Sequence, residues 1–589
     1  MHDGRTTLLT APAPELENLS FALPEPESVG EWIGRLPMAN VPEAAGQIRQ
    51  ATFEIARLDT DWATRMALLE GIRPTILYLT ARLDKAANSA GASADAITRL
   101  AQRLQTNLCS GYKAIVLAAQ DAAESDAEAC RTVSLAIHRA LSDLSRTLLR
   151  TLQYYVAPAD KLWLTLHQLY LLAETLQIQE EEHADTINDG SPALSIRTVY
   201  LRSVLLALAR PYQLRHRELS DVFSALSGWG RLTQLSADMQ NAIYAVDLSS
   251  DKGPGPSKSL KANASCRGIE LNALMTELES HLNRTEAGAE PAAVELGLIS
   301  HLTGAWGEMT SRAFSRADSS EPIQLCVGLK SAHYYLSDNA EFSDTIRKTA
   351  STSDDRAGPF GDNVHFLPNA GEAKDVWEDA FDVGGKIPTN PKFEDPELTL
   401  FSQEAAADGD ALEDPYPCFE STAADMSPSG YRLRWSQPFP PNLQTGELIG
   451  LRDQADPRWC LAVARWIRQD EHGPFMGVEL LAPQSRPVAI RVVQSKGSQA
   501  EFQRAFLLPE LKPLGRPATL ITPASPFKGG QKVVILENGK QTTAQLGECL
   551  LKTGSFNQFS FRVLDGYLEK PGGEPNMGNQ INKNQHGFR

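Results

Sequence analysis

Alternating apolar runs between residues 425 and 483 constrain the fold of this chain more than any other feature. The stretch begins with D-M-S-P-S-G at 425–430, continues with Y-R-L-R-W, and reaches G-E-L-I-G-L at 446–451. R-W-C-L-A-V-A-R-W-I-R at 458–468 and G-V-E-L-L-A-P at 477–483 follow. Each run is rich in β-forming residues and ends at a Gly, Pro or Asp signal. The stretch therefore predicts consecutive antiparallel strands of a small barrel.

A long helical region precedes these strands. From about Pro42, apolar residues recur at three-and-four spacing, which is typical of buried helix faces. Two such faces are Ile97, Leu100, Leu104 and Leu108, and Ile137, Leu141, Leu144, Leu148 and Leu152. The pattern predicts a helical bundle or irregular solenoid.

Local signals add detail to this helical region. Ser191-Pro192 predicts the start of a helix that Pro211 closes. The run P-I-Q-L-C-V-G-L, which begins at Pro322, predicts a strand set between helices. Near residue 163, the spacing W-x-x-L-x-x-x-Y resembles the first helix of a tetratricopeptide repeat. His167 stands where that repeat usually has glycine, and no second copy follows at the expected period.

The composition changes sharply after the helical region. From Ala357 to Tyr431 there is not one arginine, while Asp, Glu, Gly and Pro are frequent, which is typical of an acidic, extended linker. Farther on, Asn538-Gly539 between two β-forming runs predicts a hairpin, because type I′ turns need positive φ at both central residues. The fold class is therefore multidomain, with a helical N-terminal region, an antiparallel β-barrel and a further β-rich segment. The predicted parts are a loose arm at 1–40, a helical domain at 41–345, an acidic linker at 346–415, a barrel at 416–495, a β-rich extension at 496–567 and a disordered tail at 568–589.

Composition excludes several classes of protein. A net charge of −17 argues against binding of a nucleic-acid polymer, which needs clustered Lys and Arg. The seven cysteines are scattered and never form C-x-x-C, as expected in a reducing compartment. No secretory signal and no apolar stretch long enough for a membrane span is recognisable. We therefore expect a cytoplasmic protein.

Enzyme signatures are missing from the sequence. There is no P-loop, no G-x-S-x-G, no H-E-x-x-H and no dinucleotide fingerprint after a strand. The histidines are spread singly, and His167 on its aromatic helix is interpreted as a packing residue. The sequence predicts no enzyme, no metal and no resident cofactor.

The order of motifs in the 425–483 stretch resembles the PilZ domain, a six-stranded barrel that is a common bacterial receptor module for cyclic di-GMP. D-x-S-x-x-G is followed by G-E-L-I-G-L, by W-C-L-A-V-A-R-W-I and by G-V-E-L-L, over about eighty residues in all. The resemblance implies cyclic di-GMP as the ligand.

The chemistry of these residues suits that ligand. Asp425 can accept N–H groups of a guanine edge, and the Ser427 hydroxyl can bind the base or a phosphate. Gly430 permits a close approach of the backbone. Strand alternation places Arg432 and Arg434 on the outer face when Tyr431, Leu433 and Trp435 fill the barrel. Arginine suits the ligand because its planar guanidinium forks onto phosphate and stacks on bases.

One family motif is absent where it is expected. The resemblance implies R-x-x-x-R in the segment that leads into the first strand, with both arginines clamping phosphates and stacking on guanine. In this chain that segment is the arginine-free acidic stretch, and the nearest upstream arginines, Arg347 and Arg356, have the wrong spacing.

Three functional hypotheses follow. The first is a bacterial signalling protein whose PilZ-like barrel binds cyclic di-GMP and whose helical region contacts a protein partner. The second is a ligand-independent structural adaptor, in which Asp425 and Ser427 form only a polar turn and Arg432 and Arg434 are ordinary exposed residues. The third is an enzyme with dispersed catalytic residues.

Overall fold

The computed structural model describes most of the chain outside its acidic segment and its two ends. The described residues are 9–87, 94–155, 158–185, 193–240, 242–286, 294–307, 317–347, 414–427, 430–437, 439–440, 442–453, 458–470, 473–482, 485–493, 500–510 and 517–565. The predicted linker at 346–415 lies largely outside these ranges, and the predicted tail at 568–589 lies wholly outside them.

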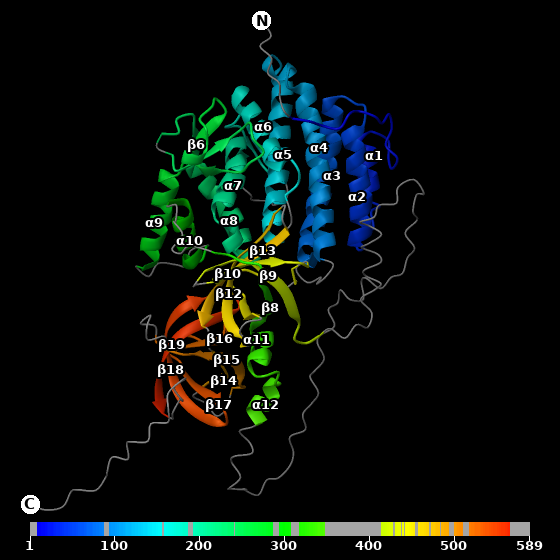
Figure 1. Cartoon of the computed structure of the whole chain (residues 1–589). Helices are drawn as coiled ribbons and strands as arrows, with labels where there is room; N and C mark the ends of the chain where they lie inside the picture. Colours follow the sequence, from blue (N-terminus) through cyan, green and yellow to red (C-terminus); the bar gives the residue numbers. More distant parts are fainter. Residues whose placement is uncertain are drawn as a thin grey trace, which may run out of the picture.

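Long helices form the N-terminal half of the molecule, as the spacing of apolar residues predicts (Figure 1). All residues of the two predicted faces are buried, among them Leu104, Leu108, Ile137 and Leu141, each with no exposed surface. Val29 is also buried, so the segment predicted to be a loose arm packs on the bundle where it is described. The helices are α1 (Pro26–Ile33), α2 (Val41–Arg57), α3 (Trp62–Ala87), α4 (Ala94–Ala119), α5 (Ala127–Gln153), α6 (Leu162–Thr175), α7 (Ile196–Leu208) and α8 (His216–Trp229).

The ends of α7 test two local predictions. Ser191 and Pro192 lie outside the described residues, and the helix begins later, where the Ser195 hydroxyl accepts the Thr198 N–H as an N-cap. It ends three residues before Pro211, which begins the short helix η3 (Pro211–Gln213), so the predicted closure is confirmed.

A small sheet and two further helices complete this half. The sheet order is β3 (Gln234–Ser236), β6 (Cys266–Glu270), β4 (Tyr244–Asp247) and β5 (Gly255–Pro256). The helices are α9 (Asn272–Glu286) and α10 (Leu296–Gly307), and a two-stranded ladder joins β1 (Glu182–His183) to β2 (Leu194–Ser195). Among the described residues, no helix is long and apolar enough to cross a membrane.

Buried ion pairs connect the central helices. Arg73 on α3 contacts Asp143 on α5 at 2.7 Å, and both side chains have no exposed surface. Arg73 and Arg146 also contact Asp185, which follows β1. Burial raises the pKa of the Asp185 carboxyl, but the two arginines outweigh that effect and hold the pKa below its usual range. These pairs tie the segment after β1 to α3 and α5.

His138 on α5 lies beside this network and is kept neutral. It is 1% exposed, and neither ring nitrogen has a hydrogen-bond partner within the described ranges. Burial lowers the pKa of His138 to about 3, and Arg139 and His183 act in the same direction. In the unfolded chain His138 takes up a proton near pH 6.5, whereas in the folded protein it stays neutral down to about pH 3. The contribution of His138 to the free energy of unfolding is therefore fully retained above pH 6.5 and is lost progressively as the pH falls toward 3.

His138→Leu is therefore expected to lose less stability on acidification than the unmodified protein. Below about pH 6.5 the difference should grow by roughly 1.4 kcal/mol per pH unit, because the variant has no imidazole to protonate on unfolding. Urea unfolding at pH values of about 7.5, 6.0 and 5.0 measures it. Identical pH dependence in the two proteins would contradict the buried neutral state of His138.

The strands predicted after residue 416 form a closed ring with one strand from much earlier in the chain. The pairing order is β10 (Gly430–Trp435), β13 (Gly473–Ala482), β12 (Cys460–Asp470), β11 (Leu448–Asp453), β8 (Pro322–Val327) and β9 (Cys418–Ser427), and β9 pairs with β10 to close the ring. β8 is the strand predicted from P-I-Q-L-C-V-G-L. A short strand, β7 (Ala317–Asp318), pairs with β9 on its other side.

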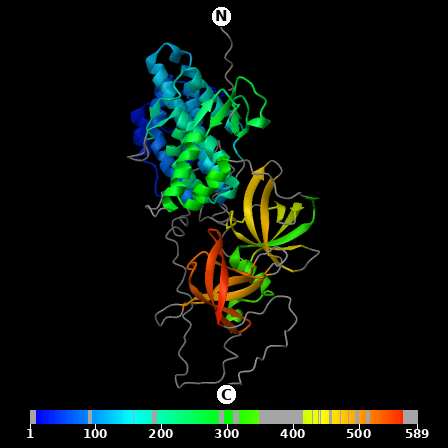
Figure 2. The same cartoon turned by 90° about the vertical axis from the view of Figure 1, so that its left-hand side faces the viewer.

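A second closed barrel follows the first. Its order is β14 (Arg486–Val492), β15 (Gln503–Leu508), β16 (Thr519–Pro523), β19 (Phe556–Asp565), β18 (Lys540–Lys552) and β17 (Lys532–Glu537). β14 lies within 416–495 yet pairs with β15 and β17. Asn538 and Gly539 both have positive φ between β17 and β18, so the predicted hairpin is confirmed. Helix α11 (Gly328–Leu336) packs where the barrels meet, with α12 (Phe342–Arg347) next to it (Figures 1 and 2).

Candidate functional site

The D-x-S-x-x-G sequence contains the end of β9 and the start of β10, and the two residues between these strands lie outside the described ranges. In the register, Gly430 lies opposite Ser427, Tyr431 opposite Met426, and Arg432 opposite Asp425. The Ser427 hydroxyl donates a hydrogen bond to the Gly430 carbonyl at 3.2 Å. The fold thus brings all five residues predicted from the sequence onto one hairpin, since Arg434 follows two positions after Arg432 on β10.

Asp425 and Arg432 form an ion pair across this hairpin. The Arg432 Nε lies 2.7 Å from Asp425 Oδ2, and the two side chains are 41% and 11% exposed. The Arg432 end of the pair is open to water and salt, whereas the Asp425 residue is largely buried, at 8% exposed. The pair orients the Arg432 guanidinium and the Asp425 carboxylate relative to each other across the hairpin.

The predicted alternation along β10 is confirmed. Leu433 and Trp435 are buried in the barrel core, whereas Arg434 is exposed and Arg432 half-buried. Phe475 on β13 lies directly opposite Arg434 and shares its face. Both guanidinium carbons lie 5.3 Å from the centre of the Phe475 ring. Cation–π contacts therefore hold the two arginines side by side over one aromatic ring.

Gly430 has a structural role at the start of β10. A Cβ atom there would lie 1.9 Å from the Val478 carbonyl oxygen, far inside van der Waals contact. The backbones of β10 and β13 consequently approach each other more closely than any side chain permits. The close approach expected from the sequence is thus made to the neighbouring strand.

β7 brings a third strand to this hairpin. Ala317 pairs with Met426 and Asp318 pairs with Asp425, so β9 lies between β7 and β10 at the D-x-S-x-x-G turn. The residues that precede Ala317 in the sequence are R-A-F-S-R at 312–316. Arg312 and Arg316 lie outside the described residues, but the chain that follows them is paired directly with the candidate site.

The first strand of this barrel is therefore β8 and not a strand after residue 416. β8 precedes β9 in the barrel, so the segment leading into its first strand ends near residue 321. In the sequence, R-A-F-S-R at 312–316 has the R-x-x-x-R spacing and lies just before the stretch predicted to form β8.

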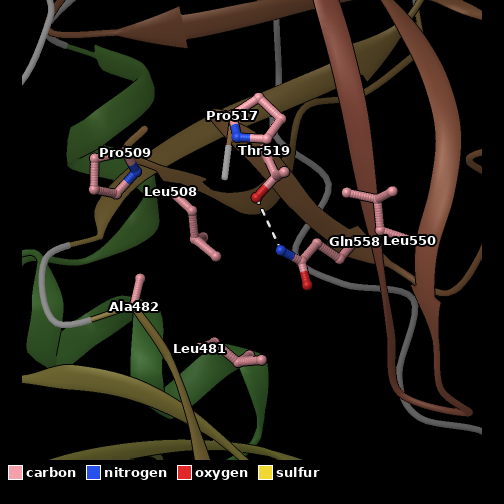
Figure 3. Close-up of a pocket in the computed structure, with 8 residues that line it drawn as sticks. All are labelled: Leu481, Ala482, Leu508, Pro509, Pro517, Thr519, Leu550 and Gln558. Atoms are coloured by element: carbon pink, nitrogen blue, oxygen red, sulfur yellow. Dashed lines mark hydrogen bonds between the residues drawn. The ribbon is translucent and has the colours of Figure 1, made fainter. Parts of the chain in front are cut away.

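A separate cavity lies between the two barrels and has a different character. It encloses about 260 Å³, and Gln558 Nε2 donates to Thr519 Oγ1 at 2.9 Å in its wall (Figure 3). The lining consists of Leu481, Ala482, Leu508, Pro509, Pro517, Thr519, Leu550 and Gln558. None of these side chains is charged, so the cavity does not suit an anionic nucleotide, whereas the β9–β10 surface does.

Comparison with known proteins matches nearly the whole chain. Three family models match in order: "Cyclic-di-GMP receptor FimW, N-terminal domain" at 27–240, "Cyclic-di-GMP receptor FimW, middle PilZ domain" at 243–487, and "FimW C-terminal beta-barrel domain" at 488–564. The cyclic-di-GMP receptor FimW of Pseudomonas aeruginosa is 31% identical over 587 residues, covering 95% of this chain and 93% of the relative. No solved structure matches the chain. The resemblance to the PilZ family is confirmed by the middle model.

Proposed function

Because this chain belongs to the family of the cyclic-di-GMP receptor FimW, we propose that it is itself a receptor for cyclic di-GMP. The ligand binds the outer surface of the first barrel at the β9–β10 turn. The helical region presents the signal to a protein partner, and the protein acts in the cytoplasm without catalysing a reaction. None of the seven cysteines, all of which lie in the described ranges, forms a disulfide, and this fits a reducing compartment.

The observation that carries this proposal is the pairing of β7 with β9 at Asp425. Ala317 and Asp318, which directly follow R-A-F-S-R in the sequence, pair with the D-x-S-x-x-G hairpin, and this supports the proposal that R-A-F-S-R is the second half of the family's binding motif. Arg312 and Arg316 are then the phosphate and guanine clamp that the resemblance implies. A planar guanidinium serves both purposes, since it forks onto phosphate oxygens and stacks on a base.

Asp425, Ser427, Arg432 and Arg434 supply the rest of the proposed site. A carboxylate offers about four acceptor positions, so Asp425 can receive guanine N–H groups while keeping its contact with Arg432. Arg434 is exposed and already ordered over Phe475. Pre-ordering reduces the entropy that a bound anion must otherwise remove from a flexible side chain.

Isothermal titration of the full chain with cyclic di-GMP tests the proposal. We expect binding, and we expect Asp425→Ala to weaken it by roughly tenfold or more, because a guanine edge loses its acceptor. Arg562→Ala is the matched control, since Arg562 is an exposed arginine on the second barrel that contacts Gln545. Absence of heat at tens of micromolar ligand, roughly the weakest affinity expected for a receptor, with the protein folded, would overturn the receptor function and favour the ligand-independent adaptor.

A further inference from the structure

Tyr155 of the helical region is part of the hydrophobic core of the first barrel. It directly follows the C-cap of α5, is 6% exposed, and packs in the same cluster as Leu433, Trp435 and Ile449. Its ring contacts His216 on α8 and Phe439 beyond the end of β10, with centroid distances of 5.8 and 6.1 Å. One side chain of the helical region thus reaches into the barrel beside the strand that carries the proposed ligand contacts.

Aromatic contacts continue from Tyr155 to β10. Phe439 packs edge-on against Trp435 at 5.4 Å, and Trp435 is the last residue of β10. Arg432 and Arg434 lie on the outer face of this same short strand. A ligand that binds the two arginines therefore acts on β10. On the inner face of β10, Trp435 contacts Phe439, and Phe439 contacts Tyr155.

The backbone at this junction is held in an unfavourable conformation. Tyr155 has φ of 54°, and Arg210, just before η3, has φ of 52°. Residues with a Cβ disfavour this left-handed region and adopt it where the surrounding structure compensates. For Tyr155 the compensation is burial of its ring in the barrel, so a loosened barrel mouth favours withdrawal of the ring. A ring docked in the barrel and a ring withdrawn from it are the two arrangements between which the coupling proposed below would choose.

Arg215, the residue before α8, fixes the orientation of the same junction through hydrogen bonds to both barrels. Its Nε donates to the Thr445 carbonyl of the first barrel at 2.8 Å, and Nη2 donates to Ser555 Oγ of the second barrel at 2.6 Å. The guanidinium also lies 3.7 Å from Glu447. A rotation of the barrel relative to α8 must break these directional bonds, so the junction resists intermediate positions.

We infer that Tyr155 couples occupancy of the barrel's cyclic di-GMP site to the conformation of the helical region. The inference rests on the proposed function and adds the route by which that site acts on α5 and α8. Tyr155 is a positioning residue, since it lies on the inner side of the barrel and not among the ligand contacts. Ligand binding shifts the balance between the two arrangements only by the difference in affinity that it has for them.

Hydrogen exchange of the full-length protein, with and without cyclic di-GMP, tests the coupling. We expect the ligand to change exchange rates in the last turn of α5 and the first turn of α8 by about fivefold or more. Tyr155→Ala should abolish this change while retaining ligand binding within about tenfold, the range of a typical coupling factor. Tyr155→Phe keeps the ring and should behave like the unmodified protein. Phe439→Leu interrupts the same contacts from the barrel side and should also abolish the change.

The outcomes separate the two proposals. Ligand binding with no change in helix exchange, or a full change in both Tyr155→Ala and Phe439→Leu, would overturn the coupling and leave the receptor function standing. Failure of the unmodified protein to bind the ligand in isothermal titration would overturn both. Circular dichroism confirms that each variant is folded before exchange is compared, and Phe439→Leu decides the question if Tyr155→Ala does not fold.

Discussion

Replacing Arg312 and Arg316 together by alanine is expected to lower the affinity for cyclic di-GMP by about 100-fold or more. Charge-assisted hydrogen bonds contribute about 1.5–3 kcal/mol each, and the proposed clamp has one such arginine at each end of R-A-F-S-R. The proposal that both act at the site rests on the pairing of Ala317, which follows Arg316 in the sequence, with Met426. Isothermal titration of the double variant measures the loss.

Two control proteins sharpen this prediction. The corresponding double lysine variant keeps both charges but loses the planar fork, so its affinity should lie between those of the unmodified protein and the alanine variant. Arg562→Ala should bind normally, because Arg562 lies on the second barrel. If the double alanine variant binds within about threefold of the unmodified protein, the clamp is absent, and the phosphates depend on Arg432 and Arg434.

Local patterns in the sequence were sufficient to predict most of the strands and the hairpin that carries the candidate site. The alternation Y-R-L-R-W placed Arg432 and Arg434 outside and Leu433 and Trp435 inside, because successive side chains of a strand face opposite ways. Asn538-Gly539 predicted its hairpin for an equally local reason, the positive φ of both residues. These features depend on neighbours within a few residues.

Pairings between distant segments could not be predicted in this way. The run from Pro322 was identified as a strand, but nothing in it indicates that β9 and β11 are its partners. About ninety residues separate β8 from β9, and the entropy of closing a loop grows only slowly with its length, so a long insertion does not prevent the pairing. The proposed R-x-x-x-R at 312–316 could not be located from the sequence for the same reason, since the position of this motif is defined relative to the first strand of the barrel.

Contacts between domains could not be predicted from the sequence either. Tyr155 lies in a helical region and has no local feature that distinguishes a residue packed in its own bundle from one packed in a barrel. Gly430 reads as a turn residue, and only the structure reveals that Val478 leaves no room for a Cβ. The position of Tyr155 and the close approach at Gly430 both depend on tertiary packing, which the local periodicity of the sequence does not predict.

Asp143→Ala is expected to lower the free energy of unfolding of the helical region by about 3–5 kcal/mol. Asp143 and Arg73 have no exposed side-chain surface and lie 2.7 Å apart, so removing the carboxylate leaves a buried guanidinium with reduced compensation. Asp185 cannot replace it fully, because its contact with Arg73 is longer, at 3.3 Å, and it also serves Arg146. Chemical denaturation followed by far-ultraviolet circular dichroism, which reports helix content, measures the loss.

The control for this prediction is an ion pair of the same chemistry at the surface. Glu31 and Arg35 are 73% and 76% exposed, so Glu31→Ala should cost less than about 0.5 kcal/mol. A double variant, Arg73→Met with Asp143→Leu, removes both charges at once and should recover much of the stability, because no unpaired charge remains buried. A loss below about 1 kcal/mol for Asp143→Ala would mean that Arg73 reaches water or another partner once its carboxylate is gone.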